Sequence, residues 1–288
     1  MKRVLITGTE GFIGSALSVH LMTSDYDVVR LDVKNSAWQS ISFSTLDVVV
    51  HAAGLAHVSY DKQMDDLYYS INRDLTLKLA AKAKKEGVTQ FIFLSSMLVY
   101  GESKAHTQAI TEVTPLNPSN AYAQSKLEAE EGLEALESEA FKVTIVRLPM
   151  VYGPNSKGNY PRLASLALKL PMFPKTNNQR SMISLNRLVH VIEFLIAQEH
   201  QGLYFPQNPE YVNTSELVKT IRKVHGKNTL LIPGTYWLQR FIARVSITSR
   251  KLFCSQYFDQ ALSRNLSDVF QETFEASIIA SEGVNHGR

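Results

Sequence analysis

The stretch that decides the fold is "ITGTEGFIGSAL", residues 6–17, which follows a short apolar run and opens a helical pattern. Its glycines, Gly8, Gly11 and Gly14, have GxxGxxG spacing. Such a turn lets the backbone approach a diphosphate and packs the helix closely against the strand. The helix N-terminus adds partial positive charge at the same place. The stretch therefore predicts a dinucleotide-binding turn, with a purely structural turn as the alternative.

Runs of β-branched and apolar residues alternate with helical patterns through the first half of the chain. We expect helices at about residues 13–22, 70–86 and 122–139. This alternation indicates an α/β protein with a doubly wound, Rossmann-like sheet of parallel strands. The runs expected to form buried strands are "RVLITG" (3–8), "DVVRLD" (27–32), "DVVVHAAG" (47–54), "QFIFLSS" (90–96) and "KVTIVRLP" (142–149).

The regular alternation ends after Tyr152-Gly153-Pro154, where prolines and asparagines become frequent. We expect a dinucleotide-binding domain over residues 1–153 and a mainly substrate-binding lobe over residues 154–288. Some segments of the lobe can return to the sheet as edge strands. Only about fifteen residues separate the second and third predicted strands, too few for a crossover helix and a further strand. The sheet should therefore be abbreviated on that side. The helices expected in the lobe lie at about 160–170, 185–199, 214–226 and 235–250.

Composition restricts the class of protein. With 288 residues and 44% hydrophobic content, the chain can bury a large core. Thirty basic and 27 acidic residues are close to balance, so nucleic acid is not expected as a partner. Cys254 is the one cysteine, which excludes an internal disulfide. No apolar stretch has the length of a membrane span or signal peptide, and we expect a soluble, cytoplasmic protein with no membrane partner.

Two features are less specific. His51 and His57 lie near the predicted turn without other ligands at metal-binding spacing, so we expect no metal site. The segment "TYWLQRFIARVSITSRKLF" (235–253) is apolar with interspersed basic residues. It suits either a membrane-surface helix or a lobe helix packed on the substrate side, and we favour the packed helix.

The segment "SNAYAQSKLEAE" (119–130) places Tyr122 four residues before Lys126 in a helical pattern. That offset puts both side chains on one helix face, one turn apart. An ammonium beside a phenol favours the phenolate and lowers the tyrosine pKa from about 10. Such a tyrosine can move a proton to or from a sugar hydroxyl while a hydride moves at the same carbon. The spacing alone also occurs in ordinary exposed helices.

Polar residues follow two of the predicted strands. Ser95 and Ser96 end the run "QFIFLSS", at the edge where doubly wound sheets bind ligands, and a hydroxyl there can bond a substrate oxygen. Asp32 ends the second predicted strand, where a carboxylate accepts hydrogen bonds from an adenosine ribose and repels a 2′-phosphate. Asp32 therefore favours NAD over NADP, which stays open as a cofactor. Because Arg30 and Lys34 flank Asp32 and the region is short, a surface aspartate at a strand end is the alternative.

Together these motifs resemble the extended short-chain dehydrogenase/reductase family over about residues 1–200. The chain is similar in particular to the NAD-dependent epimerase/dehydratase branch, which acts on nucleotide-linked sugars. The segments that match in order and spacing are "TGTEGFIG", "HAAG" (51–54), Asn72 (the family's structural asparagine), "LSSMLVYG", "YAQSK" and "RLPMVYGP".

The resemblance implies which residues form the site. Ser96, Tyr122 and Lys126 would be catalytic, and Ser96 and Tyr122 would also bind the substrate. Asn159 would meet the nucleotide end of a UDP-sugar, and Arg180 would meet its diphosphate. Family members often pair through a four-helix interface, so a homodimer is expected. The residues implied to contact NAD are Gly8, Gly11, Phe12, Ile13, Gly14, Asp32, Ala52, Ala53, Gly54, Ser95, Tyr122 and Lys126.

The residues after the second serine separate the reactions of this branch. Its 4,6-dehydratases resemble "S/T-D-E-V-Y-G", with an Asp-Glu pair that moves protons, whereas Met97 and Leu98 stand at those positions here. Neither side chain can carry a proton, so dehydration is not expected. The resemblance then implies a UDP-glucose or UDP-N-acetylglucosamine 4-epimerase, with a 4-keto-sugar reductase as the alternative. A non-catalytic dinucleotide sensor is a third hypothesis, which the joint presence of Ser96, Tyr122 and Lys126 disfavours.

Overall fold

The computed structural model describes residues 1–56, 64–102, 109–245 and 247–283. None of the helices in these ranges has the length and apolar composition to cross a membrane. The chain forms two compact units, and neither is one continuous segment. The first unit comprises Met1–Gly101, Pro115–Leu148 and Val189–Pro206, and the second comprises Glu102–Thr114, Pro149–Leu188 and Gln207–Arg288.

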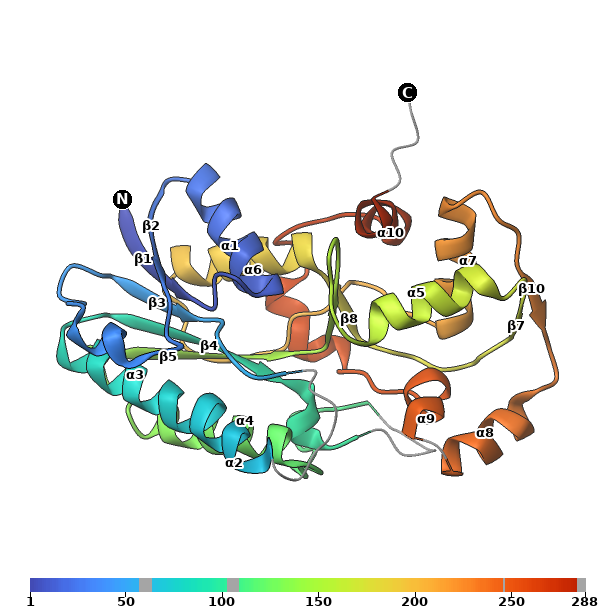
Figure 1. Ribbon diagram of the computed structural model, residues 1–288, viewed down its shortest axis with the longest axis horizontal. Helices are drawn as coiled ribbons and strands as arrows, with labels where there is room; N and C mark the ends of the chain where they lie inside the picture. The colour runs from blue at the N-terminus through green and yellow to red at the C-terminus, as the bar shows by residue number, and fades with distance from the viewer. Residues whose placement is uncertain (57–63, 103–108, 246, 284–288) are drawn as a thin grey trace. The chain divides into compact units, whose positions relative to one another are not determined.

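A six-stranded parallel sheet forms the centre of the first unit (Figure 1). Its strands are β1 (Lys2–Thr7), β2 (Tyr26–Leu31), β3 (Val48–His51), β4 (Gln90–Ser96), β5 (Lys142–Leu148) and β9 (Gly202–Tyr204). They follow the order β2-β1-β3-β4-β5-β9, and each neighbouring pair is parallel. The Rossmann-like fold class is therefore confirmed, and β9 extends the sheet with a strand from much later in the chain.

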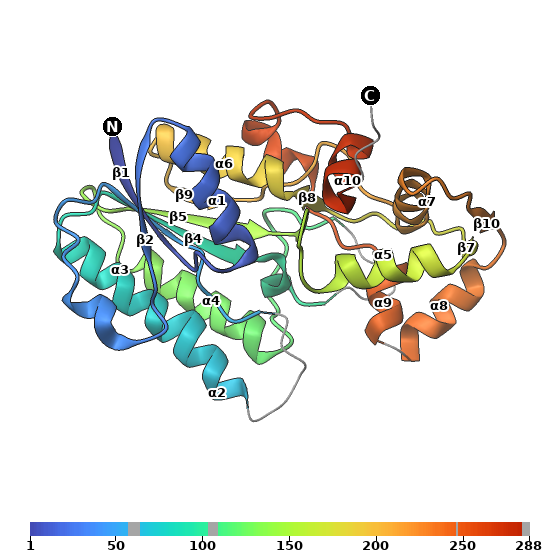
Figure 2. The same cartoon turned by 45° about the horizontal axis from the view of Figure 1, so that its top comes forward.

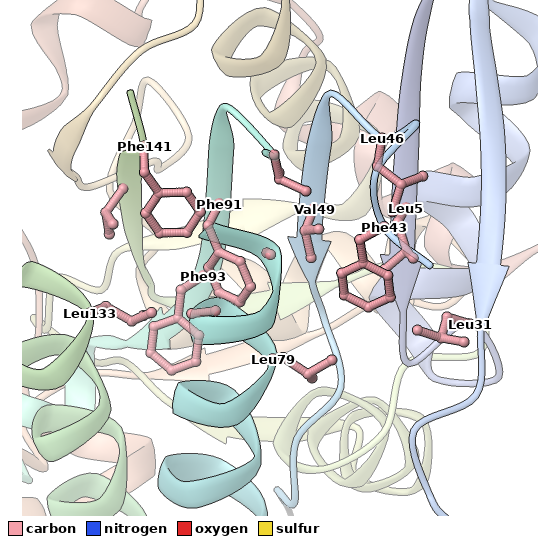
Figure 3. Packing of buried hydrophobic residues seen from close by; sticks show 14 of the residues in the cluster. Leu5, Leu31, Phe43, Leu46, Val49, Leu79, Phe91, Phe93, Leu133 and Phe141 are labelled. Atoms are coloured by element: carbon pink, nitrogen blue, oxygen red, sulfur yellow. The ribbon is translucent and has the colours of Figure 1, made fainter. Parts of the chain in front are cut away.

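Helices cover both faces of this sheet. They are α1 (Phe12–Thr23), α2 (Asp65–Tyr68), α3 (Leu75–Lys85), α4 (Ala121–Glu134) and α6 (Leu185–Ala197). Helices α3 and α4 lie along one face, and α1 and most of α6 lie along the other (Figures 1 and 2). Phe91 and Phe93 of β4 point toward α3 and α4, where they pack with Leu79 and Leu133 (Figure 3). Burial of such side chains contributes about 1.5–3 kcal/mol each.

The sheet ends at β2, as the short connection predicts. Residues Ser36–Ser40 form a 3₁₀ helix in place of a crossover helix and further strand, and Trp38 packs into the core. Two helix bounds differ from expectation. The helix expected from residue 70 begins at Asp65 and includes a π-helical turn over Tyr69–Asp74. Helix α4 ends at Glu134, because the following residues form a turn into β5.

The second unit contains two short parallel sheets. They pair β6 (Met150–Tyr152) with β8 (Met182–Ser184), and β7 (Met172–Pro174) with β10 (Leu230–Ile232). Its core gathers apolar side chains from these strands and from the helices α5 and α7. The helix expected over 235–250 is two helices. The helices of this unit are α5 (Asn159–Lys169), α7 (Thr214–Val224), α8 (Tyr236–Val245), α9 (Ile247–Phe253) and α10 (Phe274–Glu282).

Candidate active site

The turn between β1 and α1 has no room for side chains at two of its glycines. Gly8 has a φ of +68°, and a Cβ there would lie 2.6 Å from the amide nitrogen of Ala53. A Cβ on Gly14 would overlap the carbonyl oxygen of Gly8. The amide of Gly11 donates to that same oxygen at 2.9 Å, which closes the turn. Glycine is therefore required at both positions, because the turn packs directly against the loop after β3 and against the start of α1.

The start of α1 supplies partial positive charge beside this turn. Gly11 precedes the helix and offers no side chain as a cap. The first amides of a helix, here those of Phe12 and Ile13, have no partner within the helix. With the aligned peptide dipoles they favour an anion at this place. The turn therefore fits the diphosphate of a dinucleotide.

Asp32 stands directly after β2, exposed at the carboxyl edge of the sheet. Its Oδ1 accepts the amide of Lys34 at 2.9 Å. The two flanking cations are held by the glycine turn: Arg30 donates to the carbonyl oxygen of Thr9 at 3.2 Å, and Lys34 pairs with Glu10. The contact of Asp32 with an adenosine ribose stays a prediction.

Helix α4 places three ionisable groups on one face, at intervals of one turn. Asn120 fixes the start of the helix, because its Oδ1 accepts the amide of Ala123 at 2.9 Å. Tyr122, Lys126 and Glu130 then follow at four-residue spacing. Lys126 and Glu130 are both buried.

Lys126 lies between the sheet and the loop after β3. Its Nζ donates to the carbonyl oxygen of Leu94 at 2.9 Å and lies 4.5 Å from the centroid of the Phe93 ring. A Cβ on Gly54 would lie 3.3 Å from the same nitrogen. Burial lowers the pKa of Lys126 to about 8, against the opposing charge of Glu130. The ammonium form therefore still predominates near neutral pH.

The phenol of Tyr122 and the hydroxyl of Ser96 are hydrogen-bonded to each other. Ser96 ends β4, and its Oγ also accepts the amide of Leu98 at 3.2 Å. The ring of Tyr68 meets the Tyr122 ring edge-on, with centroids 5.9 Å apart. Burial raises the pKa of Tyr122, and the Ser96 hydrogen bond opposes that increase. The lowered pKa expected from Lys126 is therefore wrong for this structure, because burial outweighs the opposing contributions.

Ser95 belongs to a buried polar network that the sequence did not reveal. Its hydroxyl donates to Glu130, and Arg147 of β5 holds that carboxylate through Nε at 3.1 Å and NH2 at 2.6 Å. The remaining side of the guanidinium donates to the hydroxyl of Tyr100 at 2.6 Å. The side chain of Ser95 thus joins the core. The implied contact of Ser95 with NAD stays a prediction and would use its main chain.

Asn72 ties the loop after β3 to α4. Its side-chain amide donates to the carbonyl oxygen of Leu55 at 3.1 Å and accepts the Leu55 amide at 2.8 Å. It also donates to Ser125 Oγ at 3.3 Å, one residue before Lys126. Since Gly54 precedes Leu55, these bonds fix the "HAAG" loop against the helix that carries Tyr122.

A second polar pair supports the same loop. His51 is buried at the end of β3, and its Nδ1 lies 2.8 Å from the hydroxyl oxygen of Thr7. That oxygen also accepts the amide of Ala53 at 3.2 Å. Burial, and then the charge of Lys126, lowers the pKa of His51 to about 3, so the imidazole is neutral. In the sequence, the position of Thr7 directly before Gly8 was the one signal that this hydroxyl could support the loop. His57 lies outside the described residues.

The two implied substrate residues belong to the second unit. Asn159 opens α5 as an exposed residue after Gly158, whose φ is +91°. Arg180 donates through NH1 to the carbonyl oxygens of Lys251 at 2.7 Å and Cys254 at 3.2 Å, at the end of α9. Burial lowers the pKa of Arg180. Their contacts with a nucleotide and a diphosphate stay predictions.

Known proteins share this sequence pattern. A model of the NAD dependent epimerase/dehydratase family matches residues 4–204, more than half of the chain. The UDP-glucose 4-epimerase of Vibrio cholerae is 31% identical over 269 residues, which cover 85% of this chain and 82% of that protein. The N-acetyl-alpha-D-glucosaminyl-diphospho-ditrans,octacis-undecaprenol 4-epimerase of Escherichia coli O157:H7 is 28% identical over 243 residues, covering 76% and 71%.

Solved structures share the fold. The UDP-glucuronic acid 4-epimerase from Bacillus cereus in complex with NAD has a TM-score of 0.74 at 19% identity, over 98% of both chains. A dTDP-4-dehydrorhamnose reductase from Clostridium acetobutylicum has a TM-score of 0.76 at 19% identity, also over 98% of both chains. At these low identities the two structures bear on the fold and not on the substrate.

Proposed function

Because the chain belongs to the NAD-dependent epimerase/dehydratase family and is an NAD-dependent enzyme, we propose that it is a 4-epimerase of UDP-linked sugars. The sugar would be of the glucose or N-acetylglucosamine type. The observation that carries the proposal is the hydrogen-bonded pair of Tyr122 and Ser96, with the ammonium of Lys126 one helical turn away. The activity of the Vibrio cholerae relative supports the choice of substrate.

The chain's own residues would handle the proton. Tyr122, as phenolate, accepts the proton of the sugar 4-hydroxyl while Ser96 hydrogen-bonds the same oxygen. Bound NAD would supply the hydride chemistry at carbon 4, and the glycine turn (residues 8–14) and Lys126 would hold it. Since burial raises the pKa of Tyr122, the phenolate depends on positive charge near it. The ammonium of Lys126 and the positive ring of oxidised nicotinamide both act in that direction.

The residues after Ser96 argue against dehydration. Met97 and Leu98 begin a short 3₁₀ helix (Met97–Tyr100), and Met97 is buried. Loss of water from a 4-keto sugar needs an acid and a base near carbons 5 and 6, and neither side chain can carry a proton. The chemistry therefore remains at carbon 4.

A second candidate is the same reaction on a polyprenyl-linked sugar diphosphate. The Escherichia coli relative is a 4-epimerase of such a substrate. The long apolar chain of a polyprenyl diphosphate favours a lipid bilayer over water. The observation that favours this candidate is the exposed pair Trp237 and Phe241, one turn apart on α8. Exposed aromatic residues beside basic residues suit a membrane surface.

Incubation of the purified protein with UDP-glucose or UDP-N-acetylglucosamine, without added cofactor, tests the proposal. Formation of the 4-epimer is expected, because the epimerase cycle has no net consumption of NAD. A lack of interconversion, with stoichiometric consumption of NADH or NADPH on a 4-keto sugar, would assign a reductase instead. Interconversion confined to polyprenyl-linked N-acetylglucosamine would assign the second candidate.

A further inference from the structure

Helix α8 turns its aromatic side chains toward the solvent. Trp237 is 72% exposed and Phe241 is 60% exposed, whereas Gln239 and Ala243 on the inner face are 6% and 2% exposed. A helix that packs on its own domain normally shows the reverse order, with apolar residues inward and polar residues outward. Part of the second unit therefore exposes the kind of side chain that folding usually buries.

The small sheet next to α8 also exposes apolar side chains. Leu230 of β10 pairs with Met172 of β7, and both side chains are exposed, as is Ile232. Gln239 holds α8 next to this sheet, because its Nε2 donates to the carbonyl oxygen of Lys175 just after β7 at 2.8 Å (Figure 2). We call these exposed residues the apolar patch: Met172, Leu230, Ile232, Tyr236, Trp237 and Phe241.

The two chain segments that carry the apolar patch are basic. Residues 149–188 and 217–258 contain fourteen lysines and arginines and no aspartate or glutamate. The remaining sequence has sixteen basic and 27 acidic residues. Exposed cations flank the patch along the chain, namely Lys169, Lys175, Lys227 and Arg244. The near-neutral total charge therefore hides an asymmetry along the sequence, in which the segments that carry the patch are basic and the rest of the chain is acidic.

We propose that the apolar patch docks the second unit on the surface of an anionic lipid bilayer. Aromatic side chains are favourable at the level of lipid headgroups, and juxtaposed lysines and arginines are attracted to anionic lipids. A second copy of this chain is the less favourable occupant, because two basic surfaces would face each other. This revises the sequence-based preference for a packed helix over residues 235–253. The inference holds for either substrate candidate.

Trp237 reports on docking without a label. The chain has two tryptophans, and the other, Trp38, is buried in the first unit. The full-length protein is mixed with vesicles of phosphatidylglycerol or of phosphatidylcholine, and tryptophan emission and co-sedimentation are measured. We expect a blue shift and sedimentation with phosphatidylglycerol, both reduced at high salt because screening weakens the attraction. Binding to phosphatidylcholine should be at least about tenfold weaker.

A matched pair of variants distinguishes binding through the apolar patch from nonspecific binding by other exposed apolar residues. The double variant Trp237→Ser and Phe241→Ser removes the two most exposed aromatic residues of the patch. Its control, Val19→Ser and Met22→Ser, removes exposed apolar residues from α1. Sedimentation of the patch variant should fall at least about tenfold, whereas the control should bind like the wild type. Both variants should keep the thermal unfolding midpoint of the wild type.

Three outcomes would overturn the proposal. The first is a wild-type protein that fails to sediment with phosphatidylglycerol vesicles. A patch variant that sediments as well as the wild type would remove the role of α8. A blue shift of Trp237 that grows with protein concentration in the absence of lipid would assign the patch to a second copy of the chain.

Discussion

The phenol of Tyr122, in the first turn of α4, is hydrogen-bonded to the hydroxyl of Ser96, the last residue of β4. Local sequence fixes both ends of this bond. Asn120 caps the helix that carries Tyr122, and Ser96 follows a run of buried strand residues. Two hydroxyl groups are thereby held together at the carboxyl edge of the sheet. Catalysis by proton transfer needs such fixed positions near one substrate oxygen.

Removal of the phenolic oxygen should abolish most of the activity. Tyr122→Phe keeps the ring and its edge-on contact with Tyr68 but loses the group that accepts the proton. We expect kcat to fall by about 10²- to 10⁴-fold, the usual contribution of a general acid or base. Steady-state kinetics measure the effect, and the NAD content of the variant serves as the control. A variant with kcat close to that of the wild type would exclude Tyr122 as the proton acceptor.

Loss of the Ser96 hydroxyl should change the pH dependence of catalysis. The hydrogen bond from Ser96 lowers the pKa of Tyr122, so Ser96→Ala should raise that pKa further. The rising limb of the profile of kcat/KM against pH should then move to higher pH. Ser95→Ala is the matched comparison, because its hydroxyl bonds Glu130 in the core. It should lower stability and leave the position of the limb unchanged. Identical profiles for wild type and Ser96→Ala would contradict this assignment.

Lys126 should give the NAD-free protein a distinctive dependence of stability on pH. Burial lowers the pKa of Lys126 from 10.5 to about 8. Between these values the unfolded chain binds more protons than the folded chain, so the free energy of unfolding rises with pH. From pH about 7.5 to about 10, the wild type should gain about 2 kcal/mol relative to Lys126→Met. Urea unfolding at both pH values measures this gain, and parallel profiles would argue against a buried ammonium.

The buried carboxylate of Glu130 should matter far more for stability than an exposed neighbour. Glu130→Gln leaves the guanidinium of Arg147 buried without its counter-charge, which costs about 3–5 kcal/mol. Glu128→Gln, on the same helix, breaks a partly exposed pair with Arg73 and should cost about 1 kcal/mol or less. Chemical denaturation of the two variants gives the comparison. Equal losses of stability would show that the buried pair has no special role.

Much of the fold was predictable because it depends on local patterns. Each of the predicted features is determined by residues within one or two neighbouring helices or strands. They are the buried strand runs, the glycine turn and the four-residue offset of Tyr122 and Lys126. The strand pattern alone did not show which of Ser95 and Ser96 faces Tyr122, because a one-residue change along a strand turns a side chain to the opposite face. Only the family resemblance pointed to Ser96. The hydroxyl of Ser95 instead donates to the carboxylate of Glu130 on α4, which pairs with Arg147 on β5.

The outward direction of the aromatic residues on α8 was also hidden from the sequence. An amphipathic pattern shows that Trp237 and Phe241 share a helix face, but not whether that face meets the domain core or the solvent. The contact of Gln239 with Lys175 settles the orientation. The cytoplasmic location, the homodimer and the roles of Asn159 and Arg180 stay predictions.

In the proposed 4-epimerase reaction, one sugar molecule loses and regains its own hydride at carbon 4. The most direct measurement follows a UDP-sugar carrying deuterium at carbon 4, incubated without added cofactor and analysed by mass spectrometry and NMR. We expect a 4-epimer that retains the deuterium with the wild type, and almost no product with Tyr122→Phe. Exchange of the deuterium for solvent hydrogen, or absence of any 4-epimer with the wild type, would contradict it.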